Sequence, residues 1–397
     1  MDYWSITGAP ELPVVRITAK GMRWQRAGHP WLYRDDLVGE IKFPPGEVVA
    51  VLGPQDRFLG QAFYSANSRI ALRFVTYEEE PVDAAFWEQR LRRALDYRRL
   101  VVQDSDAFRL IYAESDGFPG LMADSYAGHL VLQTLHPGME RRLPEIIGLL
   151  ERHLTPKSIT LRHDAEVRHL EGLPLEVKTV SGELPDRLEV KIGGVRLWVD
   201  IRGGQKTGLF LDQRENRAAV AGFARGRVLD AFAYQGAFAM HLAPRAEHVT
   251  LVDSSAAALE MARENGQLNN LSNLEFVREN VFAYLKAAVA AGQRFDGIVL
   301  DPPAFAKSRG ERAAAAKGYR EINRRAFQLL NPGGVLVTCS CSYNLNEPDF
   351  LEIVREAAAD AHRQAKLIER RGAARDHPAL LSLPESLYLK CLILEVS

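Results

Sequence analysis

The spacing of hydrophobic positions changes along this chain, and the changes divide it into three predicted regions. From residue 14 to 76, short apolar runs are separated by glycine and proline, which is typical of a small all-β unit. Residues 108–199 mix strand-length apolar runs with a helical stretch at 143–153. From about Asp212 onward, apolar strands and amphipathic helices alternate strictly. That alternation predicts βαβ units and a doubly wound parallel sheet.

The boundaries follow from the same pattern. Glu78 to Pro81 forms an acidic linker, and a helix rich in arginine is predicted at 86–102. We therefore expect three domains, at 1–78 (a small β-barrel-like unit), 79–200 (α+β) and 201–397 (α/β). The strands expected in the last domain are 228–231, 248–252, 274–277, 297–300 and 335–339, with a late strand around Cys391.

Composition and charge narrow the class of protein. The chain has 397 residues, is 47% hydrophobic and carries a formal net charge of −1, so any nucleic acid must be met by a local patch. Three cysteines form no disulfide framework, and neither zinc-type spacing nor an apolar run of about 20 residues occurs. We expect a cytoplasmic protein with no metal and no membrane partner.

Acidic residues stand at the ends of two consecutive predicted strands. Asp230 precedes Gly236, a glycine that lets a ligand approach the backbone, and Asp253 can accept hydrogen bonds from ribose hydroxyls. The dinucleotide and phosphate-loop glycine patterns are absent, which disfavours NAD and ATP. The structural alternative is that Asp253 caps the next helix. Together the two carboxylates favour a nucleoside-containing ligand.

The predicted strand at 297–300 is followed by Asp301-Pro302-Pro303-Ala304-Phe305. Two prolines make a rigid loop with few donors, in which Asp301 can bond the edge of a base and Phe305 can stack on its face. The structural alternative is a strand exit stiffened by proline, with the aspartate as a cap.

The next strand ends in Thr338-Cys339-Ser340-Cys341-Ser342-Tyr343. A thiol at the carboxyl end of a parallel strand can act as a nucleophile if its surroundings favour the thiolate. Buried free cysteines are otherwise ordinary core residues. Cys341 lies nearer the strand end and is favoured over Cys339, whereas Cys391 is expected in the core.

These motifs resemble those of class I S-adenosylmethionine-dependent methyltransferases. Within that class, Gln205 to Arg214 and Cys341-Ser342-Tyr343 resemble the PUA-domain-containing 23S rRNA (cytosine-5-)-methyltransferases. The segments 20–33, 116–121 and 168–173 are similar to that family's PUA and middle domains. The resemblance implies a PUA domain, an α+β middle domain that binds RNA or substrate, and a Rossmann-like domain with a mostly parallel seven-stranded sheet.

The resemblance also implies roles for single residues. Cys341 would be the nucleophile, and Asp301 would contact both the target cytosine and the cofactor. Asn280 stands where the family is expected to have an acidic residue that contacts adenine. An amide oxygen can still accept from the adenine amino group. The other residues implied for S-adenosyl-L-methionine are Lys206, Thr207, Gly208, Asp230, Phe232, Tyr234, Gly236 and Asp253.

Basic residues surround the aspartate-proline loop. Residues 305–325 hold seven lysines or arginines against two glutamates, 7 − 2 = +5, and Lys307 and Arg309 with Phe305 are the candidate contacts to substrate. The arginines at 90–99 could extend the patch. The alternative for both stretches is a solvated helix face.

We expect methyl transfer from S-adenosyl-L-methionine to carbon 5 of a cytosine in large-subunit ribosomal RNA, that is 23S rRNA, through a covalent cysteine adduct. Two alternatives stay open: methylation of an exocyclic amino group of adenine or guanine, and a non-catalytic RNA-binding or ribosome-assembly factor. A homodimer is compatible with the sequence, which does not identify the base that removes the C5 proton.

Overall fold

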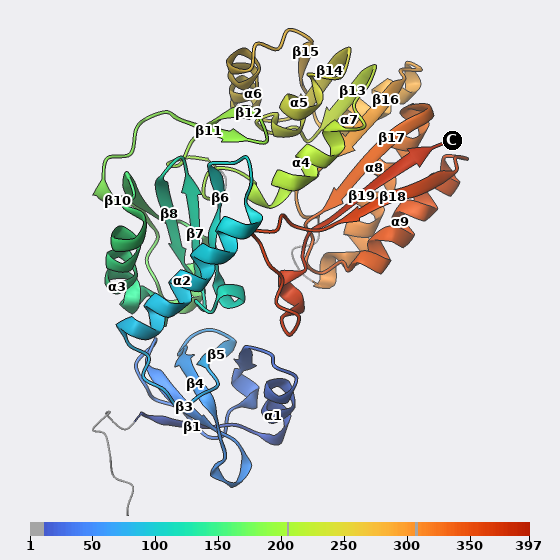
Figure 1. Cartoon of the computed structure of the whole chain (residues 1–397). Coiled ribbons are helices and arrows are strands. Elements are labelled where there is room, and N and C mark those ends of the chain that lie inside the picture. Colours follow the sequence, from blue (N-terminus) through green and yellow to red (C-terminus); the bar gives the residue numbers. More distant parts are fainter. Residues whose placement is uncertain (1–11, 205, 306–308) are drawn as a thin grey trace, which may run out of the picture.

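A computed structural model describes residues 12–204, 206–305 and 309–397. Figure 1 shows three units, each built on its own sheet: blue for the N-terminal unit, teal for the middle unit, and yellow to red for the C-terminal unit. No helix among the described residues is long and apolar enough to cross a membrane.

The N-terminal unit is a five-stranded sheet in the order β1-β3-β4-β5-β2, in which only β1 and β3 pair in parallel among the described strands. The sequence did not predict its short helix α1, which begins where the Thr18 side chain accepts a hydrogen bond from the Gly21 backbone. The elements are β1 (Val14–Arg16), α1 (Ala19–Arg26), β2 (Trp31–Tyr33), β3 (Val48–Leu52), β4 (Phe58–Tyr64) and β5 (Ile70–Thr76).

The middle unit packs two helices on a sheet in the order β10-β9-β8-β7-β6. Helix α2 crosses this sheet in Figure 1, and its Phe86 and Leu91 share a core with Leu110 and Leu132 of the strands. Helix α3 begins earlier than the predicted 143–153 because Pro137 suits a first helical turn. The elements are α2 (Ala84–Val101), β6 (Ala107–Tyr112), β7 (Leu121–Tyr126), β8 (His129–Thr134), α3 (Pro137–Leu154), β9 (Ser158–His163) and β10 (Glu176–Gly182).

A hairpin of β11 (Leu188–Ile192) and β12 (Val195–Val199) follows the middle sheet. It falls within 79–200, yet its apolar side chains belong to the core of the C-terminal unit: Val190 and Leu197 share a cluster with Phe238. The hairpin therefore packs against the C-terminal unit.

The C-terminal unit confirms the expected Rossmann-like architecture. Its described strands form a seven-stranded sheet in the order β15-β14-β13-β16-β17-β19-β18, parallel except for β19. The strands are β13 (Arg227–Ala231), β14 (His248–Asp253), β15 (Leu274–Arg278), β16 (Phe295–Leu300), β17 (Leu330–Ser340), β18 (Ala365–Arg371) and β19 (Lys390–Val396).

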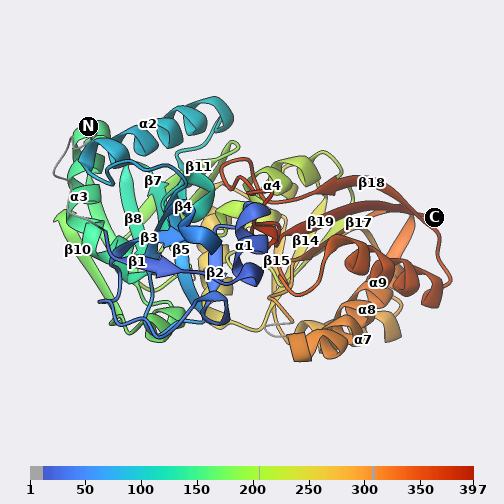
Figure 2. The same cartoon turned by 90° about the horizontal axis from the view of Figure 1, so that it is seen from below.

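Helices cover both faces of this sheet. One apolar cluster joins it to α4, α5 and α6, and another joins it to α7, α8 and α9, which lie together in Figure 2. The helices are α4 (Arg214–Ala221), α5 (Ala237–Leu242), α6 (Ala256–Leu268), α7 (Val281–Ala290), α8 (Arg312–Leu329) and α9 (Glu347–Asp360). Short 3-10 helices occur at η1 (Arg34–Asp36), η2 (Pro54–Asp56), η3 (Ala113–Asp116), η4 (Glu166–Glu171), η5 (Leu211–Gln213), η6 (Arg309–Glu311) and η7 (Pro384–Ser386).

The connection between β18 and β19, residues 372–389, contacts both other units. Asp376 accepts a hydrogen bond from the Arg109 backbone N–H at 2.9 Å, and its carbonyl accepts from Arg98 Nη2 at 2.9 Å. Glu385 lies 3.7 Å from His29 of the N-terminal unit. One segment of the C-terminal unit therefore helps to set the orientation of all three.

Candidate active site

The ends of β16 and β17 bring an aspartate and a cysteine into one crevice. The two strands are parallel neighbours with Leu300 opposite Thr338, so Asp301 and Cys341 both emerge at the carboxyl edge of the sheet. The Cys341 thiol contacts the Pro302 carbonyl oxygen at 4.0 Å. The proline loop and the thiol thus adjoin, as the order of the strands predicted.

Asp301 has an unusual acidity for a carboxyl group. Desolvation raises the pKa of Asp301 to about 6, against the pull of the nearby Arg217 guanidinium. One carboxylate oxygen accepts a hydrogen bond from Gln213 Nε2 at 2.9 Å. A carboxyl group with a pKa near neutrality can donate a proton as well as accept one.

A chain of amides fixes the orientation of Gln213. Its Oε1 accepts from Asn216 Nδ2 at 2.6 Å, and Asn216 Oδ1 accepts from Arg371 Nε at 2.9 Å. Because the arginine can only donate, the amide of Gln213 must present its N–H groups to Asp301. Gln213 lies inside the motif quoted above, but sequence reasoning gave it no role.

The Cys341 thiol lies near one buried lysine. Burial and the Asp301 carboxylate raise the pKa of Cys341, so the thiol form prevails at neutral pH in the free protein. Burial lowers the pKa of Lys390 to about 8, and its Nζ donates to the Ser342 and Tyr388 carbonyl oxygens at 2.8 and 2.7 Å. Sequence reasoning missed Lys390 because it stands in the apolar run around Cys391.

The other two cysteines are structural neighbours. Cys339 in β17 lies directly opposite Cys391 in β19, and both are fully buried free thiols. The hydrogen bond to Cys391 and burial raise the pKa of Cys339 well above its usual range. Cys391 thus occupies the core position predicted for it in a late strand.

The loops after β13 and β14 carry the residues expected near a nucleoside. Burial raises the pKa of Asp230 to about 7, and its Oδ2 accepts from the Ala239 backbone N–H at 3.0 Å. Asp253 accepts from the Tyr234 N–H at 2.9 Å and from the Ser255 N–H at 2.8 Å. Tyr234 and Phe232 have positive φ angles of 47° and 64°, a conformation that is costly for non-glycine residues and gathers at functional sites.

Three residues that the sequence assigned to the cofactor, Gly208, Gly236 and Asn280, have clear structural roles. Gly236 precedes α5 with a φ of 74°, and a Cβ there would lie 2.9 Å from Leu251 Cδ2. Gly208 has a φ of 141° and packs against Val199, where a Cβ would lie 2.6 Å from Cγ1. The Asn280 side-chain oxygen caps α7 through the two backbone N–H groups of residues 282 and 283. The oxygen proposed to meet adenine is therefore also a helix cap.

Phe305 belongs to an aromatic cluster. Its ring lies 4.6 Å from the ring of Tyr319 and also contacts Phe232 and Phe282. Lys307, expected to contact substrate, lies outside the described residues, and Arg309 begins η6.

Lys206 and Arg217 bring positive charge to the same region. Lys206 Nζ lies 2.8 Å from Asp212 Oδ2, which also accepts from Tyr388 OH at 2.5 Å. Although burial opposes it, the charges of Lys206 and His377 hold the pKa of Asp212 well below its usual range. Asp212 Oδ1, and Nε and Nη1 of Arg217, are buried without a hydrogen-bond partner among the described residues.

A cavity of about 800 Å³ lies between the middle sheet and the C-terminal unit. Lys206 and Thr207 line it, and the Thr207 hydroxyl bonds Tyr126 OH of β7 at 3.0 Å, which ties the cavity floor to the middle unit. Other lining side chains are Arg109, Tyr112, Gln133, Arg162, His377 and Tyr388.

The two basic stretches are largely paired. Arg320 of α8 bonds Glu356 and Asp360 of α9, at 2.8 and 2.6 Å. Arg324 and Arg325 both contact Glu321, while Arg98 of α2 is buried against Asp116. Lys317 is exposed and has no ion-pair partner among the described residues. This pairing favours the structural alternative for most of these arginines.

Comparison with known proteins agrees with this architecture. Residues 151–390 match the family described as S-adenosylmethionine-dependent methyltransferase, and residues 15–77 match the PUA-like domain. The chain is therefore a member of the S-adenosylmethionine-dependent methyltransferases with a PUA-like N-terminal domain, and S-adenosylmethionine is its cofactor.

Its relatives are more specific. Proteins named Ribosomal RNA large subunit methyltransferase I from Cronobacter sakazakii and Salmonella arizonae are each 41% identical over 371 residues, covering 91% of this chain and 94% and 92% of the relatives. Among solved structures, a protein assigned as a SAM-dependent methyltransferase from Streptococcus mutans has a TM-score of 0.82 at 19% identity, covering 97% of this chain and all of that one.

Proposed function

We propose that this protein transfers a methyl group from S-adenosylmethionine to carbon 5 of a cytosine in 23S ribosomal RNA, through a covalent adduct with Cys341. The observation that carries the proposal is that the Cys341 thiol contacts the carbonyl oxygen of Pro302, the residue after Asp301, and that burial raises the pKa of the Asp301 carboxyl group to about 6. The name shared by the relatives supports large-subunit ribosomal RNA as the substrate.

The two side chains divide the chemistry between them. The Cys341 sulfur bonds to C6 of the cytosine, and the electron pair of the C5–C6 double bond moves into the ring toward N3. Asp301 in its protonated form donates a proton or hydrogen bond to N3, which makes C5 a nucleophile. S-adenosylmethionine supplies an electrophilic methyl group when bound. Loss of the C5 proton to a base then breaks the sulfur–C6 bond and frees the thiolate.

The proton on Cys341 must leave before the attack. Lys390, with a pKa of about 8, carries a substantial neutral fraction at slightly alkaline pH, and as an ammonium it stabilises a nearby thiolate. Protonation of Asp301 also favours the thiolate, because the Asp301 carboxylate raises the pKa of Cys341. The reactive form of the pair is thus a thiolate beside a neutral carboxyl group.

The residues present fit the cofactor. S-adenosylmethionine has a carboxylate, an ammonium group and two ribose hydroxyls. The unpartnered donors of Arg217 suit a carboxylate, and the unpartnered oxygen of Asp212 suits an ammonium. Asp253, at the end of β14, would accept hydrogen bonds from the ribose hydroxyls.

One observation favours a second activity. Because the free Cys341 thiol has a raised pKa, it could be structural, and the Asp301-Pro302-Pro303 loop with Phe305 would then direct methylation of an exocyclic amino group of adenine or guanine. A non-catalytic assembly factor would make neither product and need not bind the cofactor.

The test uses unmodified large-subunit RNA, labelled S-adenosylmethionine and two matched variants. We expect Cys341→Ala to abolish transfer and Cys339→Ala to retain it, and mass mapping to place the methyl on C5 of a cytosine. RNA containing 5-fluorocytidine should trap a covalent complex with the wild type only. Full activity of Cys341→Ala, or a methyl on an amino nitrogen, would overturn the covalent mechanism. Failure to bind S-adenosylmethionine in calorimetry would favour the assembly factor.

A further inference from the structure

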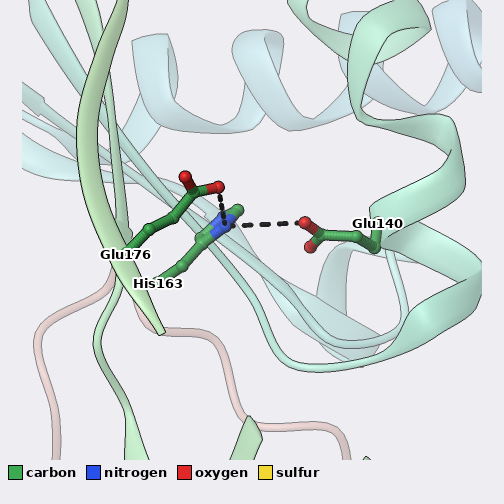
Figure 3. A group of neighbouring side chains, drawn as sticks. All are labelled: Glu140, His163 and Glu176. Atoms are coloured by element: carbon green, nitrogen blue, oxygen red, sulfur yellow. Dashed lines mark ion pairs between the residues drawn. The ribbon is translucent and has the colours of Figure 1, made fainter. Parts of the chain in front are cut away.

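Three potential metal ligands converge in the middle unit. Glu140 comes from the first turn of α3, His163 ends β9 and Glu176 begins β10, where it is the direct cross-strand partner of His163 (Figure 3). The side chain of His163 points toward both carboxylates, as Figure 3 shows. Because side chains alternate along a strand, it points away from the cavity that its neighbour Arg162 lines.

The hydrogen bonds around His163 fix which ring nitrogen carries the proton. The only proton of the Thr134 hydroxyl goes to Glu140 Oε2, so Thr134 Oγ1 can only accept from His163 Nε2 at 3.3 Å. The same oxygen accepts from Arg168 Nη1 at 2.8 Å, which fills its second lone pair. The proton therefore lies on Nε2, and Nδ1 of the neutral ring presents a lone pair.

That lone pair is buried and unpartnered. His163 is fully buried, and its Nδ1 has no hydrogen-bond partner among the described residues. The nearest polar atoms are two acceptors, Glu140 Oε1 at 3.7 Å and Glu176 Oε1 at 3.9 Å. With the imidazole neutral, three acceptors face one another without a donor, an arrangement that a cation between them would stabilise.

We propose that Glu140, His163 and Glu176 bind a divalent transition-metal ion, with Zn²⁺ as the best match to one imidazole and two carboxylates. Zinc lies about 2.0–2.2 Å from such ligands, which separates two ligand atoms by roughly 3.4 Å at a tetrahedral angle. The observed separations of 3.7 and 3.9 Å need only a small closure of side chains. The Nε2–H bond to Thr134 supplies the outer partner that metal-bound histidines use.

The ion would join the helix to the sheet. Arg168 Nη1 lies 3.1 Å from Glu140 Oε2, so it offsets part of the negative charge but leaves Oε1 free for the metal. Glu176 is exposed at the sheet edge, and water can complete the coordination there. The bound ion would link α3, β9 and β10 and raise the unfolding temperature of the middle unit.

The test is calorimetric titration of the full-length, metal-stripped protein with zinc chloride, with magnesium chloride as a comparison. The diagnostic variant is Glu176→Gln, since this exposed side chain can change without disturbing the core. The matched control is Glu183→Gln, which removes the same charge just beyond the other end of β10. We expect one Zn²⁺ per chain, weakened at least tenfold by Glu176→Gln and unchanged by Glu183→Gln.

A second measurement excludes zinc bound to the cysteines. Anomalous diffraction at the zinc edge should place the ion between His163 Nδ1 and the two carboxylates, and X-ray absorption should show nitrogen and oxygen but no sulfur ligands. The proposal would be overturned by absence of saturable zinc binding, by equal zinc affinity in Glu176→Gln, or by an ion bound to Cys341. The three side chains would then form an ion pair with a protonated His163. None of these results bears on methyl transfer, so the two proposals fail independently.

Discussion

Replacing Asp301 with Asn should stabilise the folded protein at alkaline pH while abolishing methyl transfer. The folded-state pKa of Asp301 is about 6, against an ordinary value of 3.8, a shift of about 2 units. At roughly 1.4 kcal/mol per unit, ionising this carboxyl group costs the folded state up to ~3 kcal/mol. The neutral amide avoids that cost and can still accept the hydrogen bond from Gln213.

The sign of the pH dependence follows from linkage. Between pH 4 and pH 6 the folded protein holds a proton on Asp301 that the unfolded chain has lost, so stability falls as pH rises through this window. The asparagine variant has no such loss. Its advantage over the wild type should be small at pH 4, about half developed at pH 5 and complete above pH 7.

Differential scanning calorimetry of the full chain measures the melting temperatures of the wild type and of Asp301→Asn as a function of pH. The transition to follow is the one that shifts when S-adenosylhomocysteine is added. The control is Asp296→Asn in β16, the strand that precedes Asp301. Bonds to Asn331 and to the Arg227 backbone, with nearby arginines, hold the pKa of Asp296 below its usual range despite partial burial, so this variant should be destabilised. A melting temperature of Asp301→Asn equal to or below that of the wild type at pH 8, or a gain independent of pH, would refute the reasoning.

Two further variants probe the charges around the site. Lys390→Met should slow the alkylation of Cys341 by iodoacetamide severalfold at pH 8, because the thiolate loses a nearby ammonium group. The control Lys366→Met, on the edge of the sheet, should leave the alkylation rate unchanged. Equal rates in the two variants would remove Lys390 from the mechanism. Lys317→Gln should weaken the binding of ribosomal RNA in filter assays and lower the salt dependence of that binding. The control Arg320→Gln should do neither, because two carboxylates of α9 already neutralise this arginine. Equal effects of the two variants would show that the ion pairs of Arg320 open when RNA binds.

The parts of the site that local sequence carries could be predicted, and the parts that depend on distant partners could not. Asp301 and Cys341 each end a strand, and the order of alternating strands was enough to predict that they meet. Gln213 and Lys390 take their roles from residues far along the chain, 88 positions away for Gln213 and Asp301. No local pattern encodes such a pairing.

Secondary structure shows the same division. Strand β18 (Ala365–Arg371) was not predicted because it is an edge strand rich in charged side chains, with few apolar positions to indicate burial. Strand β10 was missed for the same reason, since most of its side chains are exposed. The metal ligands on α3, β9 and β10 lack a recognisable spacing in sequence, and only the fold brings them together.

The contacts of the β18–β19 connection have a consequence for how the chain folds during synthesis. Arg98 and Arg109 of the middle unit bond to Asp376, which follows them by 278 and 267 residues. Until Asp376 has been made, the backbone N–H of Arg109 has no Asp376 carboxylate to bond, and Arg98 lacks one of its acceptors. The middle unit can form its sheet early, but its buried polar network is complete only after Asp376 has left the ribosome. Truncation before Asp376 should therefore expose the middle unit to proteolysis, and it also removes Lys390 from beside Cys341.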